Sequence, residues 1–327
     1  MHAHDLSTRF RRVMLAALAA PVLGACGGIA DDGDAGKDAL APLCDGVAID
    51  AGAVGCNGKV IQLSSASACG IDAPPAVPSN VCTNLCGGPN YSCTYDSSTD
   101  LLTCQSFCTG RLPSGLRDDF AGARADAVGD WLARAAYLEA AAVDAFAILA
   151  AELGAHGAPR ALVRAAERAG ADEVRHAREM GALARAFGGE PAVPSVGPRN
   201  VRAVAEIALE NAIEGCVRET FGALVATWQA EHASDFRVRA AMKRIARDET
   251  RHAALGWRVF DWAASRLGSA DRLHVEHAMQ VAVAELEAAN RAEPDRRLAR
   301  TLGLPNSREA LALVAAMRSE LWQSRAA

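Results

Sequence analysis

Two features that would narrow the function of the chain are missing from its sequence. The formal net charge of the 327 residues is only −5 and 22% of them are charged, so the composition gives no sign of nucleic-acid binding. The apolar run from Val13 to Leu23 is far too short to span a bilayer. Half of the residues are apolar, however, and the length suffices for about two domains. We therefore expect a globular protein with a substantial core and no nucleic-acid partner.

Residues 1–26 have the layout of an export signal. Arg11 and Arg12 precede the apolar run Val13–Leu23, which is followed by Gly, Ala and Cys26. This resembles the signal peptide and cleavage box of bacterial lipoproteins, with Cys26 as the acylated residue. The alternative is an ordinary signal peptide cut nearby, and the paired arginines also resemble a twin-arginine signal. We expect residues 1–26 to lie outside the fold. The mature protein would be exported and anchored by lipid in the cell envelope, at the periplasmic face of the outer membrane.

The next two segments differ sharply in composition. Residues 27–43 are rich in Gly, Ala and Asp and predict a flexible, acidic tether. Residues 44–110 carry eight cysteines among Gly, Pro, Ser and Asn: Cys44, Cys56, Cys69, Cys82, Cys86, Cys93, Cys104 and Cys108. An even count in an exported segment too polar to hold a core predicts a module with four disulfides of undetermined connectivity.

Two Cys-x-x-x-Cys pairs in this module support a different interpretation. Cys82 with Cys86, and Cys104 with Cys108, would form a four-thiolate zinc or iron knuckle that resembles the electron-transfer module of rubrerythrins. Their spacing is three residues rather than two, and four further cysteines need partners. Disulfides remain the preferred prediction.

Residues 118–327 are rich in alanine and show helical patterns without any strand pattern. A connection from Gly189 to Pro198 contains Pro and Gly and is longer than a tight helical hairpin needs. Caps and breakers predict helices over 124–153, 159–187, 201–231, 235–267 after an N-cap at Ser234, 270–291, and 308–324 after a cap at Ser307.

A five-residue motif occurs twice in this helical part. The sequence from Asp172 to His176, Asp-Glu-Val-Arg-His, returns 76 residues later from Asp248 to His252 as Asp-Glu-Thr-Arg-His. Residues three apart share one side of a helix, so each motif presents a carboxylate and an imidazole together. Upstream residues repeat with a shift of 75: Glu139, Asp144 and Phe146 return as Glu214, Glu219 and Phe221.

Over residues 120–267 this arrangement resembles the ferritin-like di-metal carboxylate family. There, two helices of a four-helix bundle give one Glu each and the other two give Glu-x-x-His. The resemblance implies such a bundle with one or two extra C-terminal helices. The implied metal ligands are Glu139, Glu173, His176, Glu214, Glu249 and His252. In the family an Asp accepts a hydrogen bond from a ligating His, a role that falls to Asp172 and Asp248, with Arg175 and Arg251 beside them.

The position of each carboxylate along its helix helps to select the ligands. Glu139 lies as far before the predicted end of its helix as Glu173 lies after the start of the next, so the two share one level. Asp144 would lie about 7 Å nearer the turn. In the second hairpin the loop is less sharply marked, and Glu219 stays open as the alternative. The repeat with Glu139 selects Glu214.

The implied ligand set suits iron or manganese better than copper or structural zinc. Two metal ions, most simply iron, bridged by Glu173 and Glu249 could share the reduction of dioxygen or peroxide, with no catalytic residue apart from the ligands. We therefore expect an envelope oxidoreductase that needs an electron donor of unknown identity. The alternatives are a non-catalytic iron-binding or sequestering protein and a scaffold with a relic site. The intact ligand set argues against the scaffold.

A Cys26→Ser change tests the predicted anchor. Each buried lipid methylene contributes about 0.8 kcal/mol to membrane attachment. We expect the variant to leave the membrane fraction, or to stay unprocessed, while the metal site stays assembled. Fractionation and mass spectrometry measure the outcome. Wild-type protein recovered as soluble periplasmic material without a lipid mass shift would refute the anchor.

Overall fold

A computed structural model describes two compact units of the chain. One unit comprises Met1–Ala17 and Phe107–Ala327, and the other comprises Leu18–Ser106. The described residues within them are 8–10, 12–13, 46–49, 59–63, 91–96, 100–106, 111–113, 116, 126–197, 200–291 and 293–323. The described residues are mostly helical, as predicted for the C-terminal part of the chain.

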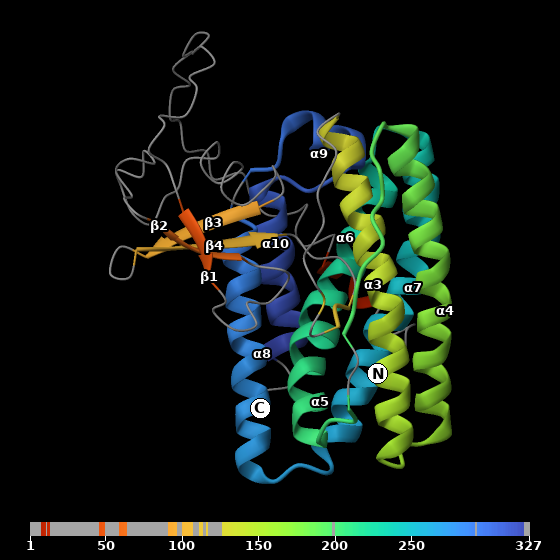
Figure 1. Ribbon diagram of the computed structural model, residues 1–327, viewed down its shortest axis with the longest axis vertical. Helices are drawn as coiled ribbons and strands as arrows, with labels where there is room; N and C mark the ends of the chain where they lie inside the picture. Colours follow the sequence, from red (N-terminus) through yellow and green to blue (C-terminus); the bar gives the residue numbers. More distant parts are fainter. Residues whose placement is uncertain are drawn as a thin grey trace. The chain divides into compact units, whose positions relative to one another are not determined.

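The larger unit is built from helices that run alongside one another (Figure 1). Three of the predicted helices are continuous and long: α3 (Ala127–Ala155), α4 (Arg160–Ala186) and α7 (Phe236–Ala264), and α6 (Thr220–His232) is the second part of another. The third predicted helix begins as α5 (Val204–Asn211) and passes through the π-helix η2 (Ala212–Glu219) before it continues as α6. The rest are α8 (Ser269–Ala289), the unpredicted α9 (Arg296–Leu302), α10 (Ser307–Met317) and the π-helix η3 (Arg318–Trp322).

Carboxylate and amide side chains begin several of these helices. Asp126 accepts a hydrogen bond from the backbone N–H of Val128 and so caps α3. The predicted caps at Ser234 and Ser307 are wrong by one residue. Asp235 caps α7 by accepting from two first-turn N–H groups, and Asn306 forms a capping box for α10. In each case the neighbour has the side-chain oxygen that reaches the orphan N–H groups.

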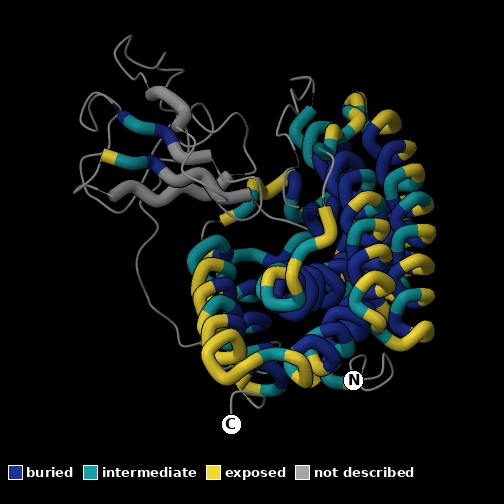
Figure 2. The backbone as a smooth tube through the Cα atoms, turned by 60° about the horizontal axis from the view of Figure 1, so that its bottom comes forward, coloured by how far each residue is buried: buried dark blue, intermediate teal, exposed yellow. Residues whose placement is uncertain are grey.

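Pairs of helices pack closely because their facing residues are small. α3 packs along α4, α6 along α7, and α4 along α7. Their facing sides are buried, mostly by alanine and leucine, and their outer sides are exposed (Figure 2). The backbone of η2 almost touches α7 where Gly215 meets Gly256. A side chain on either glycine would push the two helices apart.

Residues near the N-terminus also belong to the helical unit. Residues 8–10 and 12–13 are helical, and Phe10 and Val13 are buried in its core. We expected residues 1–26 to lie outside the fold. An apolar helical face that stays attached to the chain buries its side chains, which explains the difference. Cys26 and the tether 27–43 lie outside the described residues, so export and anchoring stay predictions.

Among the helices of the described residues, none is both long and apolar enough for a bilayer crossing.

The smaller unit contains a four-stranded antiparallel sheet that the sequence did not predict. Its strands are β1 (Gly46–Ile49), β2 (Lys59–Leu63), β3 (Tyr91–Asp96) and β4 (Leu101–Ser106), in the order β1-β2-β4-β3. In the backbone register, Cys93 of β3 lies opposite Cys104 of β4. The other six cysteines of the module lie outside the described residues. Four disulfides therefore stay a prediction.

The glycine contact between η2 and α7 generates a test of stability. An added Cβ at Gly256 would lie 2.8 Å from the backbone of Gly215, so Gly256→Ala overpacks the contact. We expect it to lower the free energy of unfolding by about 1–3 kcal/mol in urea titrations. Gly154→Ala in α3 is the matched control, since nothing lies within 4 Å of its added Cβ. That control should stabilise slightly, by about 0.5–1 kcal/mol. Equal effects of the two changes would refute the packing argument.

Candidate metal centre

Six acidic and imidazole side chains meet in the interior of the helical unit. α4 supplies Glu173 and His176, and α7 supplies Glu249 and His252 from the equivalent positions of the repeated motif. α3 contributes Glu139, and the last residue of η2 contributes Glu219. None of the six is more than 4% exposed.

The potential ligand atoms fall into two groups that share two carboxylates. Glu139, Glu173, His176 and Glu249 form one group, and Glu173, Glu219, Glu249 and His252 form the other. Within each group the atoms lie within 4.8 Å of one another. Glu173 and Glu249 belong to both, which is where residues that bridge two metal ions would stand. Five of the six ligands expected from the sequence are thus brought together.

Glu214, the sixth expected ligand, is not part of the cluster. Its carboxylate binds the guanidinium of Arg218 and accepts a hydrogen bond from the backbone N–H of Leu112 (3.4 Å). Glu219 takes its place in the cluster.

The π-helix explains why the repeat selected the wrong residue. Its wider i→i+5 turns change the angular position of every residue from Ala212 to Glu219, so a constant shift of 75 no longer preserves the helix face. The level of each residue still identifies the ligand. Glu219 lies 13 residues before the end of α6 at His232, and Glu249 lies 13 residues after the start of α7 at Phe236.

Each histidine is oriented by an aspartate of the opposite motif. His176 Nε2 lies 3.2 Å from Asp248 Oδ2, and His252 Nε2 lies 3.2 Å from Asp172 Oδ2. This is the pairing expected for Asp172 and Asp248, made across the interface between α4 and α7. Because an aspartate oxygen lies against Nε2 of each ring, the other nitrogen, Nδ1, faces the cluster.

The Nδ1 atoms therefore point at the shared carboxylates. His176 Nδ1 lies 3.1 Å from Glu249, 3.3 Å from Glu173 and 3.6 Å from Glu139. His252 Nδ1 lies 2.9 Å from Glu173, 3.4 Å from Glu249 and 3.8 Å from Glu219.

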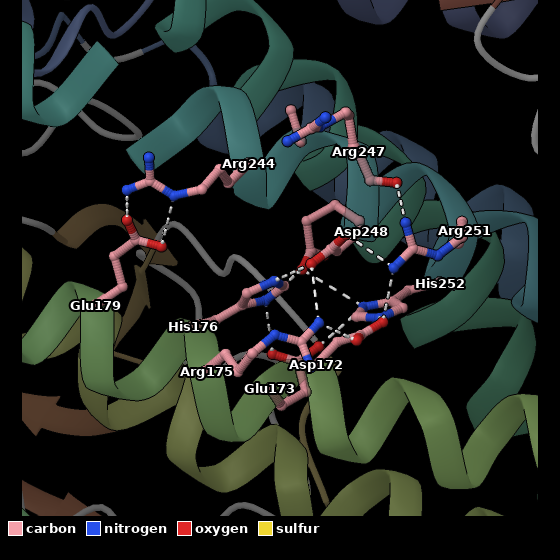
Figure 3. A network of polar contacts seen from close by, with 12 residues as sticks. Asp172, Glu173, Arg175, His176, Glu179, Arg244, Arg247, Asp248, Arg251 and His252 are labelled. Carbon is pink, nitrogen blue, oxygen red and sulfur yellow. Dashed lines mark hydrogen bonds and ion pairs between the residues drawn. The ribbon is translucent and has the colours of Figure 1, made fainter. Parts of the chain in front are cut away.

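Two arginines hold the aspartates from the outer side (Figure 3). Arg251 lies 3.0 Å from Asp172 and 2.8 Å from Asp248. Arg175 pairs with Asp172 and lies 3.3 Å from Asp248. More than half of each arginine side chain is exposed. The arginines therefore lie beside the aspartates, as expected, and are at the same time largely open to solvent. Although burial opposes it, hydrogen bonds from His252 and Arg175 hold the pKa of Asp172 below its usual value.

The buried carboxylates of the cluster favour bound protons or other positive charge in their midst. Burial and the nearby carboxylate of Glu173 raise the pKa of Glu139 well above its usual value, and burial raises the pKa of Glu219 to about 8. Against the effect of burial, the surrounding glutamates raise the pKa of both His176 and His252. Every shift except that of Glu173 favours holding a proton, as expected where anionic groups crowd together in an apolar interior.

Hydrogen bonding within the cluster is also incomplete. Eight of its buried atoms make no hydrogen bond to any described residue: Glu139 Oε2, both Oε atoms of Glu173 and Glu219, Glu249 Oε1, and Nδ1 of His176 and His252. Buried polar atoms rarely stay unpaired in folded proteins. Four carboxylates and two imidazoles fit two divalent cations in charge and in donor type, and these are the atoms that such ions would contact.

Comparisons with protein-family models, curated proteins and solved structures find no match to this chain. The assignment of the centre therefore rests on its own geometry.

One buried residue near the centre escaped the sequence analysis. Arg111 Nη1 donates to Asn211 Oδ1 (3.0 Å), and Asn211 Nδ2 donates to the carbonyl of Gly256 (2.9 Å). These bonds tie Arg111 through the last residue of α5 to α7, and the backbone N–H of Leu112 reaches η2 at Glu214. No motif or repeat in the sequence marks Arg111 for this position.

Separate substitutions of Glu214 and Glu219 by glutamine test which of them is a metal ligand. We expect Glu219→Gln to reduce bound metal below two equivalents, because it removes a charged carboxylate that belongs to one of the two ligand groups. Glu214→Gln, on the same π-helix, should retain two equivalents and lose only the contacts to Arg218 and Leu112. Metal analysis after iron(II) loading measures both. The opposite result would restore Glu214 as the ligand.

Proposed function

We propose that the helical unit is a ferritin-like four-helix bundle that carries a di-iron or mixed iron/manganese centre. In this proposal the protein is an oxidoreductase that acts on dioxygen or peroxide, anchored in the cell envelope. The observation that supports it best is the set of eight buried, unbonded donor atoms on Glu139, Glu173, His176, Glu219, Glu249 and His252, which face one another in two overlapping groups.

The donor set favours iron or manganese over other metals. Each group contains three carboxylates and one imidazole and no thiolate. Copper and structural zinc are typically held by more imidazoles or by thiolates, and calcium and magnesium by oxygen alone. Four carboxylates would also balance the charge of two divalent cations.

The residues divide into those that would hold the metals and those that would hold the ligands. Glu139 and His176 would bind one ion, Glu219 and His252 the other, and Glu173 and Glu249 both. When bound, two iron(II) ions supply two electrons, which with two protons reduce one dioxygen to hydrogen peroxide or one peroxide to water. Return to iron(II) needs two electrons from an external donor.

The surrounding chain orients the residues of this site and covers them. Asp172 and Asp248 fix both imidazoles with Nδ1 inward, which prepares the ligand geometry before any ion binds. Arg175 and Arg251 neutralise the two aspartates on the solvent side. Phe146 covers His252 edge-on at 5.1 Å and is itself fully buried. The burial of the site residues strengthens electrostatic interactions among them.

A non-catalytic iron-binding protein would use the same ligands, so turnover decides between the two functions. We expect protein loaded anaerobically with two equivalents of iron(II) to react within seconds of an oxygen pulse, and to react again after each addition of a reductant. Absorption spectroscopy and oxygen consumption follow the cycles.

Glu173→Ala is the control, because it removes one bridging position and should abolish the paired-metal absorption. One slow, stoichiometric oxidation that reductant cannot renew would instead identify an iron-binding protein. Failure of the wild-type chain to bind two metals would refute both functions.

A further inference from the structure

A small cavity adjoins the candidate metal centre among helices α3, α4, α6 and α7. Two of its lining residues are the candidate ligands Glu139 and Glu249. Its other lining residues are Trp131, Ala135, Met180, Gly222, Ala226, Gln229, Met242 and Ile245.

The lining residues follow the helix repeat away from the ligands in one direction. On α3, Ala135 and Trp131 lie about one and two turns before Glu139. On α7, Ile245 and Met242 lie about one and two turns before Glu249. The residues that line the cavity thus span about two helix turns, and the cavity itself is small, about 20 Å³. Trp131, only partly buried, lies at its far end from the ligands.

Small residues on α6 provide the space. Gly222 and Ala226 lie three and seven residues after Glu219, on nearly the same side of the helix. At the corresponding distance in the opposite direction, seven residues after Glu139, Phe146 fills the interior against His252. The centre is therefore closed by an aromatic ring at one end and flanked by small side chains at the other.

The lining selects by polarity as well as by size. Apart from the two ligands, its one polar side chain is Gln229, whose amide donates to the carbonyl of Leu302 (3.0 Å). A charged or strongly hydrated molecule would lose its water here without new partners, which costs several kcal/mol. A small, uncharged, nonpolar molecule meets no such penalty.

We propose that this cavity binds a small nonpolar gas beside Glu139 and Glu249, and that Ala226 sets its width. In the proposed function, on which this inference rests, the gas is dioxygen. Hydrated iron and charged organic substrates are disfavoured on this path by its apolar lining.

Xenon is a suitable probe because it occupies apolar cavities without needing a metal. We expect xenon in the cavity of metal-free crystals of the full chain under pressure. Ala226→Leu adds three heavy atoms to the lining and should abolish that xenon site. Ala230→Leu is the matched control, since it makes the same change on the same helix outside the lining.

Oxygen kinetics then connect the cavity to the centre. With two iron(II) bound, Ala226→Leu should slow oxidation by dioxygen roughly tenfold, a typical effect of a few misplaced carbons in an apolar pocket. Ala230→Leu should react like the wild type. Met242→Ala widens the same cavity, so it should bind more xenon and react at least as fast. This variant keeps the test decisive if Ala226→Leu does not fold.

The outcomes separate this inference from the proposed function. A protein that binds two metals but takes up no xenon, or whose oxidation rate ignores both cavity changes, overturns the inference alone. A protein that takes up xenon but does not bind two metals overturns the proposed function, and with it the role of the cavity in oxygen delivery.

Discussion

Charge repulsion among four buried carboxylates is the constraint on which the helical unit depends. Glu139, Glu173, Glu219 and Glu249 lie at one level, each at most 4% exposed. An uncompensated buried carboxylate costs several kcal/mol, so this cluster would destabilise the fold unless cations or protons balance it. The pKa values of Glu139 and Glu219 are raised, so these two carboxylates bind protons more readily than exposed glutamates do. Divalent cations bound by the same atoms would remove the repulsion between the carboxylates and would connect the helices that carry them.

The two repeated motifs are complete only when they are together. Asp172 orients the histidine of the second motif, and Asp248 orients the histidine of the first. The carboxylates of Glu173 and Glu249 likewise enter both ligand groups. Neither hairpin could therefore form half of the centre in its final geometry by itself. The same contacts pack α4 against α7, so the chemistry of the site and the stability of that interface depend on the same residues.

The sequence predicted a buried Glu/His cluster that could hold a metal ion, but it ranked the two candidate glutamates before α6 in the wrong order for that cluster. The two copies of the motif Asp-Glu-x-Arg-His place four of the clustered residues, Glu173, His176, Glu249 and His252, because residue spacing on a regular α-helix determines direction. Glu219 was kept only as the alternative to Glu214, because the hydrogen bonding of a π-helix is not predicted by any short pattern in the sequence. The four-stranded sheet was missed because its strands are 4 to 6 residues long and lie among Cys, Gly and Ser, where composition points to loops. Caps were misplaced by one residue because Ser234 stands next to Asp235 and Ser307 next to Asn306, and all of these residue types can cap a helix.

The two halves of the repeat differ in structure at the π-helix η2. In the first half Asp144, the counterpart of Glu219, is exposed on the regular helix α3. In the second half the wider turns of η2 bring Glu219 fully inside, and Thr220 Oγ1 bonds the carbonyl of Gly215 five residues earlier (3.0 Å). Wider turns need room, which the contact of Gly215 with Gly256 supplies by letting backbone lie against backbone. A π-helix is less stable than an α-helix of the same length and is found most often at functional sites. The π-helix contains both Glu214, which lies outside the cluster, and Glu219, which lies in it. We infer that the irregular turns of this segment serve to place Glu219 in the cluster.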